Sequence, residues 1–459
     1  MAINTSLIDR YGADTKGPYY TSYPTLGEWS ENFSDQDFKN SLDKFISQKD
    51  NSFSLYIHYP YCVKLCHFCI CNAYATGKKE NQQKALDYLI REMGSLNNFF
   101  QQHDSIPNIK EIHFGGGSPS FLDIEDFEKL VDKIELTVKL GDIDEVALEI
   151  DPRTATLEKM HYYANRGIDR ISFGIQDFDP VVQNAINRVQ PFDYVEKFLS
   201  EDIRKKYKSL NFDLLYGLPF QTRESFRKTM DLTCKISPER VTLLRYAHVP
   251  DIKKNMRLID DAKIVDNTEK TIMFIESTEK LLAEGYEYIG IDNFAKPTDA
   301  LAIAFKNKTV GRNFIGFTPG RVNNMIGIGP SATSVFGEAY AQNVYNLIDY
   351  YKTDVDKHFP IERGHKMSRD DFIRRDAIFR ILCDLSINWD EFDNHHGINS
   401  REYFNEEIKE LNSFIYSGIL ESENGSINIT KDGRYFLRHV AGVFDSYVKN
   451  KPEYIIHGT

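Results

Sequence analysis

Residues 62–71 read Cys-Val-Lys-Leu-Cys-His-Phe-Cys-Ile-Cys and hold four of the chain's six cysteines. A run typical of a β-strand, Phe53–His58, precedes them, and residues 72–79 are typical of a loop, so the thiols are expected just beyond the C-terminal end of a strand. This is the edge at which α/β folds place their chemistry. Disulfides between such close neighbours would be strained, so the pattern favours a metal ion or an iron–sulfur cluster.

The spacing of the cysteines separates these two possibilities. Zinc sites usually consist of two separated Cys/His pairs, and the sequence has no second pair at a suitable distance, although His67 is close. Ferredoxins use two-residue gaps and a Cys-Pro ending. Gaps of three and then two residues give a [4Fe–4S] cluster three thiolates and leave one iron open to a small chelating molecule. If Cys71 were a fourth ligand, the cluster would be closed and the chain would be an electron carrier.

The Cys-x3-Cys-x2-Cys motif resembles that of radical S-adenosylmethionine (SAM) enzymes. Its continuation through Cys71 and Asn72 narrows the resemblance to the oxygen-independent coproporphyrinogen III oxidase (dehydrogenase) family. The resemblance extends over essentially the whole chain. It implies a [4Fe–4S] cluster and two SAM molecules as cofactors, with Cys71 outside the ligand set. The implied metal ligands are Cys62, Cys66 and Cys69.

The composition is that of a globular protein long enough for one large domain and a smaller one, with 459 residues, 41% of them hydrophobic and 27% charged. A formal charge of −12 argues against nucleic acid as the main partner, because a phosphate backbone selects an excess of Lys and Arg. The N-terminus lacks the apolar core of a signal peptide, and no apolar run is long enough for a membrane span. Cys234 and Cys383 are isolated and are interpreted as reduced core residues. We therefore expect a cytoplasmic enzyme.

Strand-like and helix-like segments alternate from about residue 50 to residue 300. Such βα units predict a parallel sheet with right-handed crossovers. Six units, fewer than the eight of a closed barrel, predict an α/β fold with a partial (β/α)6 TIM-like barrel, which matches the radical SAM fold. The expected strands are Phe53–His58, Glu111–Phe114, Glu145–Ile150, Arg170–Ile175, Asn211–Tyr216 and Val241–Tyr246, and the expected helices include Gln82–Phe99, Ile124–Leu140, Leu157–Arg166 and Arg223–Ser237.

Three consecutive segments are expected: an N-terminal segment over 1–36, the barrel over 37–345 and a small C-terminal, mainly helical domain over 346–459. By resemblance, the first lies close to the active site and the last covers the mouth of the barrel. The last domain is expected to be winged-helix-like. DNA binding by analogy with winged helices is disfavoured by its mixed charge. Its expected elements are helices Asp370–Leu385 and Glu402–Tyr416, a hairpin over Leu420–Ile429 and a helix over Lys431–Val448.

Two predicted strands end in residues suited to binding SAM. Glycines let a backbone approach a ligand closely, although Gly-rich turns are also common connectors. A carboxylate at a strand end can accept both hydrogen bonds of a ribose diol, the alternative for Glu149 being an ion pair with a neighbouring Arg or Lys. The resemblance implies that Gly116, Gly117 and Ser118 contact the amino group and backbone of SAM, and that Glu149 binds its ribose.

Tyr56 and His58 are the candidate catalytic residues, and their spacing places both on one side of the first strand. The resemblance places Tyr56 beside the SAM at the cluster, whereas His58 is either a polar contact to the cluster or substrate or an ordinary strand histidine. Arg188 could hold a carboxylate or be a surface charge. Thr333, which stands where the family has Ile, completes the SAM-binding candidates. The positions that match family contacts to the second SAM are Phe68, Gln176, Arg188, Asp213 and Ala247.

The resemblance implies the oxidative decarboxylation of coproporphyrinogen III to protoporphyrinogen IX in haem biosynthesis. A radical made from SAM abstracts a hydrogen from the β-carbon of a propionate, and loss of carbon dioxide and one electron leaves a vinyl group. Expected partners are the porphyrinogen substrate and an electron donor such as a flavodoxin, with no nucleic acid or membrane partner and a monomeric state.

Departures from the family pattern keep related reactions open. Tyr19 stands where the family usually carries Arg, and Ile315 where it has Gln. The alternatives are methylation, cyclopropanation or anaerobic haem degradation with the second SAM. A haem chaperone on the same scaffold is a further alternative, although such relatives usually lack a cysteine at position 71.

Overall fold

The computed structural model describes residues 7 and 18–450. Its contacts divide the chain into two compact units, each built from segments that are distant in sequence. We call residues 30–265 and 322–366 the sheet unit, and the described parts of 1–29, 266–321 and 367–459 the second unit. The segments expected from the sequence, 1–36, 37–345 and 346–459, are each continuous in sequence, unlike these two units. Their boundaries stay a prediction.

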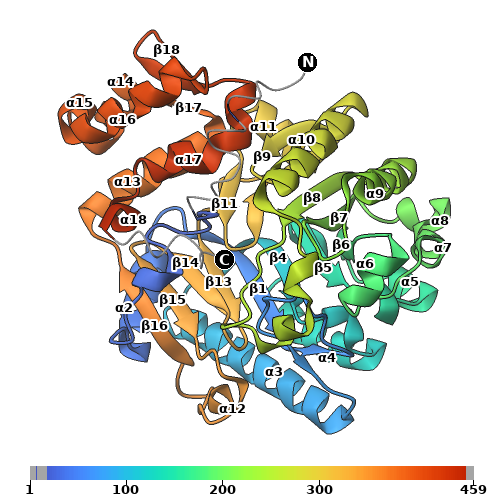
Figure 1. The fold of residues 1–459 in the computed structure, drawn as a ribbon. Helices are drawn as coiled ribbons and strands as arrows, with labels where there is room; N and C mark the ends of the chain where they lie inside the picture. Colours follow the sequence, from blue (N-terminus) through green and yellow to red (C-terminus); the bar gives the residue numbers. More distant parts are fainter. Residues whose placement is uncertain (1–6, 8–17, 451–459) are drawn as a thin grey trace. The chain divides into compact units, whose positions relative to one another are not determined.

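A sheet of mainly parallel strands forms the sheet unit (Figure 1). β1 pairs in parallel with β13 on one side and with β4 on the other, and the parallel series continues through β5, β6, β7 and β8. Within the described residues of this unit the sheet stays open, which confirms the predicted α/β partial barrel. The spatial order is β16 (Ile361–Lys366), β15 (Ala339–Asn343), β14 (Thr333–Phe336), β13 (Met325–Ile328), β1 (Ser52–Tyr59), β4 (Asn108–Gly116), β5 (Glu145–Ile150), β6 (Arg170–Gln176), β7 (Ser209–Tyr216) and β8 (Arg240–Arg245).

Helices follow the parallel strands and lie outside them in the sheet unit (Figure 1). Their sequences explain where they begin. In α4, the Asp123 side chain accepts from the amide of Asp126 at the N-terminus, and α9 begins with a capping box between Thr222 and Ser225. The helices of this unit are α2 (Asp35–Ile46), α3 (Lys79–Gln102), α4 (Ile124–Glu135), α5 (Leu157–Asn165), α6 (Pro180–Ala185), α7 (Phe192–Glu196), α8 (Glu201–Arg204), α9 (Arg223–Ile236) and α12 (Leu347–Tyr350).

The four strands on the other side of β1 were not predicted from the sequence. β13 extends the parallel series, and β14, β15 and β16 then pair in antiparallel fashion. β13 is only four residues long and contains Gly327, which gives it no strand-like alternation. The glycine is required by packing, because a Cβ there would lie 2.4 Å from the carbonyl oxygen of Thr333.

The second unit combines short strands and helices. The expected hairpin over Leu420–Ile429 is present as β18 (Leu420–Glu423) and β19 (Ser426–Ile429), with β17 (Ser386–Asn388) on the other side of β19. The other elements are α10 (Asn267–Ala283), β9 (Glu287–Gly290), β10 (Asn293–Ala295), α11 (Ala300–Lys306), β11 (Gly311–Asn313), β12 (Gly316–Thr318), α13 (Arg369–Phe379), α14 (Trp389–His396), α15 (Ser400–Tyr403), α16 (Asn405–Tyr416), α17 (Leu437–Gly442) and α18 (Ser446–Asn450).

Several predicted helices differ in extent from the observed ones. The helix expected over Glu402–Tyr416 is interrupted at Phe404, because α15 ends at Tyr403 and α16 begins at Asn405. The single helix expected over Lys431–Val448 is divided into a 3-10 turn at Asp432–Phe436, α17 and α18. It breaks because the Asp445 carboxylate accepts from the amides of Tyr447 and Val448 and so begins a new helix. The helix expected over Ile124–Leu140 ends at Glu135, before the β-branched pair Thr137 and Val138, which favours helix less.

Two tyrosines of the expected N-terminal segment, Tyr20 and Tyr23, are buried within the second unit. The Tyr20 hydroxyl donates to Asp445 at 3.0 Å, and the Arg438 guanidinium lies 4.1 Å from the centre of the Tyr19 ring. Residues 1–6 and 8–17 of that segment lie outside the described residues.

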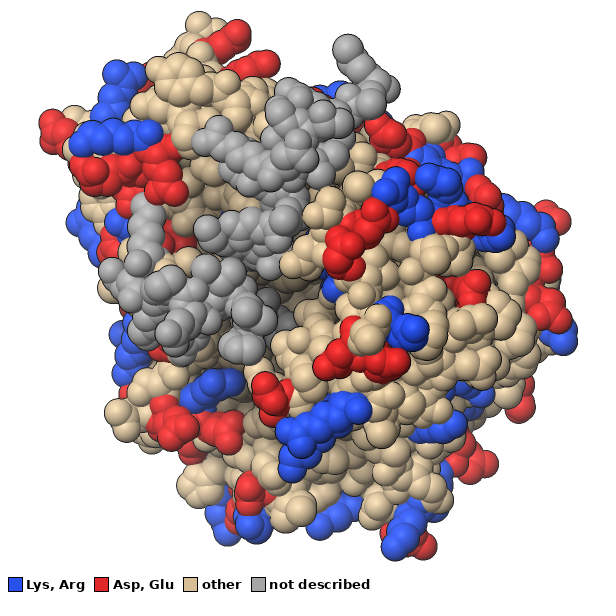
Figure 2. Space-filling view, in the orientation of Figure 1, with Lys and Arg blue, Asp and Glu red and all other residues tan. Residues whose placement is uncertain are grey.

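Helix length and surface charge bear on a membrane or polyanion partner. Among the described residues, no helix is both long and apolar enough to span a bilayer. On the face drawn in Figure 2, the Lys and Arg side chains of the described residues are interspersed with Asp and Glu. That face therefore gives a phosphate backbone no continuous basic surface.

Candidate functional site

The clustered cysteines lie on one loop of the sheet unit, at the C-terminal end of β1. β1 ends at Tyr59, β2 covers Tyr61–Cys62, and the loop continues to β3 (Tyr74–Ala75). All four thiols are free; Cys66 is buried and Cys71 is exposed, while the other two are half-buried. The prediction that these thiols follow the C-terminal end of a strand is therefore confirmed.

A zinc ion and a [4Fe–4S] cluster bind their sulfur ligands at different spacings. Two sulfurs on one zinc lie at most about 4.6 Å apart, because each Zn–S bond is about 2.3 Å. Among the described residues, the group of three or more ligand atoms within 4.8 Å of one another is Asp376, His395 and His396, in the second unit. Cys62, Cys66 and Cys69 offer three sulfur donors from one loop, and such an all-thiolate set is the kind that holds an iron–sulfur cluster.

The backbone of the cysteine loop is held by the segment that follows β8. Lys253 Nζ donates to the carbonyl oxygen of Cys71 at 3.1 Å. Asn255 Nδ2 donates at 3.0–3.1 Å to three carbonyl oxygens of the loop, those of Cys66, His67 and Cys69. These contacts fix the conformation of the loop on which the thiols depend.

Apolar side chains of the same loop anchor it to the barrel. Phe68 and Ile70 pack, partly buried, against a small hydrophobic cluster. The cluster consists of Val182, Ile186, Leu215, Leu218, Tyr246, Met256 and Ile259.

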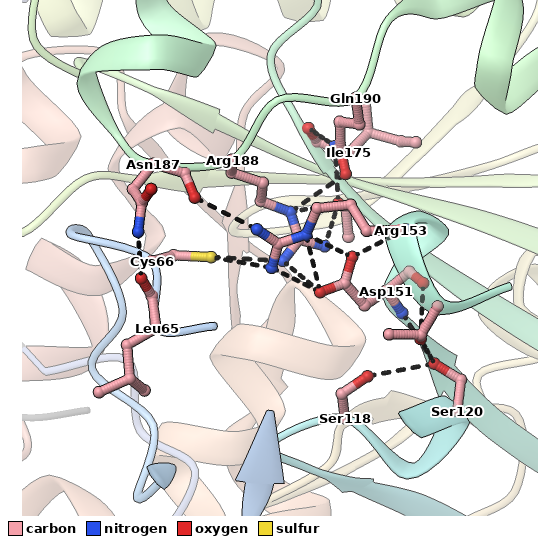
Figure 3. Close-up of polar contacts among 12 residues, drawn as sticks. Leu65, Cys66, Ser118, Ser120, Asp151, Arg153, Ile175, Asn187, Arg188 and Gln190 are labelled. Atoms are coloured by element: carbon pink, nitrogen blue, oxygen red, sulfur yellow. Dashed lines mark hydrogen bonds and ion pairs between the residues drawn. The ribbon is translucent and has the colours of Figure 1, made fainter. Parts of the chain in front are cut away.

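Two guanidinium groups converge on the sulfur of Cys66 (Figure 3). Arg153 Nη2 and Arg188 Nη1 each lie 3.5 Å from Cys66 Sγ. Asp151 joins them, because its Oδ2 accepts from Arg153 at 2.6 Å and from Arg188 at 3.4 Å. Burial alone would raise the pKa of Asp151, but the arginines, Arg188 foremost, lower it. The carboxylate is therefore ionised, and the group carries a net positive charge beside one thiol.

A chain of hydrogen bonds links the two candidate catalytic residues to the end of the cysteine loop. His58 Nε2 lies 2.9 Å from the carbonyl oxygen of Asn72, which can only accept, so Nε2 carries the proton. His58 Nδ1 then accepts from the Tyr56 hydroxyl at 3.0 Å. Burial lowers the pKa of His58 and raises that of Tyr56, so both side chains are neutral near pH 7.

The glycine turn after β4 packs tightly against these residues. Gly116 has φ +107°, and a Cβ there would lie 2.8 Å from the His58 ring. A Cβ on Gly117 would lie 2.8 Å from the carbonyl oxygen of Tyr61. The amide of Ser118 donates to that carbonyl at 3.0 Å. The glycines are therefore required by the close approach of the chain itself, whatever ligand the turn also contacts.

Glu149 has a histidine partner rather than the Arg or Lys considered from the sequence. Glu149 Oε1 accepts from His113 Nε2 at 2.9 Å, and His113 Nδ1 accepts from Arg170 at 3.3 Å. The carboxylate side chain is still 40% exposed. It is therefore held in place by a neutral donor while part of it stays accessible to a ligand.

The remaining candidates lie on β6, β7 and β14 or just after β8. Gln176 ends β6 in the left-handed region, with φ +66°, an uncommon conformation that is found often at functional sites. Asp213 lies on β7, where burial raises its pKa, and accepts from Ser172 at 2.6 Å. Ala247 follows β8 and is exposed, whereas Thr333 begins β14 and is buried.

Sequence reasoning missed the residues that support the site. Asp151 and Arg153 follow β5 directly but carried no predicted role. Asn187 Nδ2 donates to the carbonyl oxygen of Leu65 in the cysteine loop. Asn255, which lies further along the chain, donates to the carbonyl oxygen of Cys66 in the same loop. An Asp-Pro-Arg ending is a local signal for the first pair, whereas nothing in the sequence marks Asn255.

Comparisons with known proteins agree with this geometry. A model of the radical SAM superfamily matches residues 56–233. The chain is 35% identical over 438 residues to the oxygen-independent coproporphyrinogen III oxidase of Helicobacter pylori (strain ATCC 700392 / 26695), covering 94% of both chains. The chain belongs to the oxygen-independent coproporphyrinogen III oxidase family. The enzyme of that name from Escherichia coli K12 is 33% identical over 446 residues, covering 97% of this chain and 96% of the relative.

A solved structure supports the same membership. Coproporphyrinogen III oxidase from Escherichia coli, described as a radical SAM enzyme, matches with a TM-score of 0.89 and 32% identity, covering 97% of this chain and 99% of that chain. The resemblance drawn from the cysteine motif is confirmed. The chain is a radical SAM oxidoreductase, and its superfamily implies a [4Fe–4S] cluster and SAM.

Proposed function

We propose that this chain converts coproporphyrinogen III to protoporphyrinogen IX by oxidative decarboxylation without oxygen. Two propionate side chains each lose carbon dioxide, one hydrogen atom that the radical made from SAM takes up, and one further electron that passes to an electron acceptor, and each becomes a vinyl group. The observation that carries the proposal is a loop at the C-terminal end of β1 with four free thiols, three of them in the Cys-x3-Cys-x2-Cys motif, in a chain 35% identical over 94% of its length to an enzyme named for this substrate.

We propose that Cys62, Cys66 and Cys69 hold the cluster and that Cys71 does not. The spacing of the motif supports this assignment, and so does the exposure of Cys71, which is greater than that of the other three thiols. With three thiolate ligands one iron is left for SAM. When bound, the cluster and SAM supply a radical that can abstract a hydrogen atom from the β-carbon of a propionate.

The chain's own residues would bind and orient SAM and shield the radical made from it. Tyr56 and His58 are fixed by hydrogen bonds and uncharged, so in this proposal they direct polar contacts without exchanging protons. Glu149 would receive the ribose hydroxyls of the SAM at the cluster with the carboxylate that His113 orients. The glycine turn at Gly116, Gly117 and Ser118 would contact the amino group of this SAM, and Thr333 would be a further contact to the same molecule.

A second SAM molecule is part of this proposal. Its candidate contacts come from the cysteine loop, from β6 and β7 and from residues that follow β6 and β8, and they all belong to the sheet unit. Arg188 is constrained there, since its Nη2 donates to the carbonyl oxygen of Gly174 at 2.7 Å. The proposed set is Phe68, Gln176, Arg188, Asp213 and Ala247. A flavodoxin-like electron donor, a monomeric state and a cytoplasmic location stay predictions.

The decisive experiment is mass spectrometry of products after anaerobic incubation with coproporphyrinogen III, SAM and a low-potential reductant. We expect two products together with 5′-deoxyadenosine. The first is lighter than the substrate by one carbon dioxide and two hydrogens, and the second is lighter by twice that amount. A methylated or cyclopropanated product would instead assign the chain a related reaction. Stoichiometric hemin binding without cleavage of SAM would support the haem chaperone and reject the proposal.

A further inference from the structure

The sulfur of Cys66 has surroundings unlike those of the other two thiols of the motif. Arg153 and Arg188 both donate to it at 3.5 Å, and Cys66 is the thiol of the three for which the described residues supply guanidinium donors. Cys66 and Asp151 are also nearly inaccessible, at 6% and 5% exposure. Charges in such a buried place are weakly screened by solvent.

We propose that Arg153 is a positioning residue that raises the reduction potential of the cluster by donating to Cys66 Sγ. The inference rests on the proposed ligation by Cys66. It assigns a role to a residue that neither binds SAM nor ligates iron in the function proposed above.

The sign follows from electrostatics. Reduction adds one negative charge to the cluster, so hydrogen bonds and positive charge at a ligating sulfur stabilise the reduced state. Arg153 provides both, and its guanidinium cannot lose its proton in a protein. Asp151 opposes the effect with its own charge. The pair therefore predicts shifts of opposite sign when either charge is removed.

Arg153 is held in this orientation before any cluster binds. Its backbone amide donates to Asp151 Oδ1 at 3.0 Å, and its Nε and Nη2 donate to the same carboxylate at 3.0 and 2.6 Å. Its Nη1 donates to the carbonyl oxygen of Asn187 at 3.2 Å. Four directed contacts leave Nη2 facing Cys66 (Figure 3). A planar fork fixed in this manner loses little entropy on contacting the sulfur.

The test is the midpoint potential of the anaerobically reconstituted full-length protein, measured by redox titration with electron paramagnetic resonance. Arg153→Met should make the reduced cluster about tenfold less favoured at equilibrium. For one electron this corresponds to a midpoint potential about 59 mV more negative than that of wild type. Arg153→Lys, which keeps the charge without the fork, should give a smaller negative shift. Asp151→Asn should shift the potential in the positive direction.

Arg166→Met is the matched control, because Arg166 pairs with Glu128, Asp132 and Glu135 and should leave the potential unchanged. Equal potentials for Arg153→Met and wild type, at equal iron content, overturn the inference. Shifts of the same sign in Arg153→Met and Asp151→Asn also overturn it, since they indicate a merely structural role. Cys66→Ala separates the two proposals: if it retains a full cluster, the ligand assignment fails, and the inference fails with it.

Discussion

Replacing Asn255 by Asp tests whether the loop conformation, and not only its thiols, determines cluster binding. The side chain keeps its shape but loses the Nδ2 donor that serves three carbonyl oxygens at 3.0–3.1 Å. An amide nitrogen carries two hydrogens, so we count two full hydrogen bonds at about 1 kcal/mol each. The loss is then about 2 kcal/mol, or about thirtyfold in cluster affinity. The new carboxylate facing the carbonyl dipoles adds to that loss.

The assay compares retention of iron by wild type and Asn255→Asp during anaerobic competition with a chelator, with iron content and visible absorbance as readouts. Asn51→Asp is the matched control, because Asn51 is also half-buried and its Nδ2 donates to one backbone carbonyl, that of Ile46, away from the loop. The control should retain its cluster as wild type does. If Asn255→Asp retains iron equally well while its far-UV circular dichroism is unchanged, the reasoning about the loop is refuted.

Two further substitutions test the residues around the thiols. Because burial lowers the pKa of His58, the stability due to its neutral form is present above the unfolded-state pKa of about 6.5 and is lost as the pH falls through the folded-state value. Between pH 7 and pH 5 the free energy of unfolding of wild type should therefore fall more than that of His58→Gln, as measured by urea denaturation of the apoproteins. A difference between the two proteins that does not change with pH would contradict this reasoning. Gly117→Ala, whose Cβ would lie 2.8 Å from the Tyr61 carbonyl oxygen, should lower the free energy of unfolding by about 1–3 kcal/mol, whereas Gly141→Ala meets nothing within 4 Å and should be neutral; equal thermal midpoints would reject the packing argument.

The parallel strands β1 and β4 to β8 could be predicted from sequence because each is at least six residues long and carries apolar residues bounded by turn signals. β5 was predicted with its observed limits, Glu145–Ile150. β13 was missed because four residues around a glycine show no period, and its place beside β1 depends on packing against segments far away in the sequence. The division of the last helix followed from one carboxylate, Asp445, whose capping role a helical pattern does not reveal.

The same distinction applies to the site. The thiols, the glycine turn and Glu149 could be located because each belongs to a short motif at the end of a strand. Asn255 could not, since it reaches Cys66 across 189 positions and is an ordinary loop residue in sequence. Arg153 lies between these cases: its pairing with Asp151 is local, but its contact with Cys66 spans 87 positions.

The central claim is that three thiolates bind the cluster and that one iron is left for SAM. The most direct measurement is the electron paramagnetic resonance spectrum of the reduced Cys71→Ala protein before and after addition of SAM. We predict a full cluster signal that changes on SAM binding, followed by release of 5′-deoxyadenosine. Loss of the cluster in Cys71→Ala, or a signal that SAM leaves unchanged, would contradict the account.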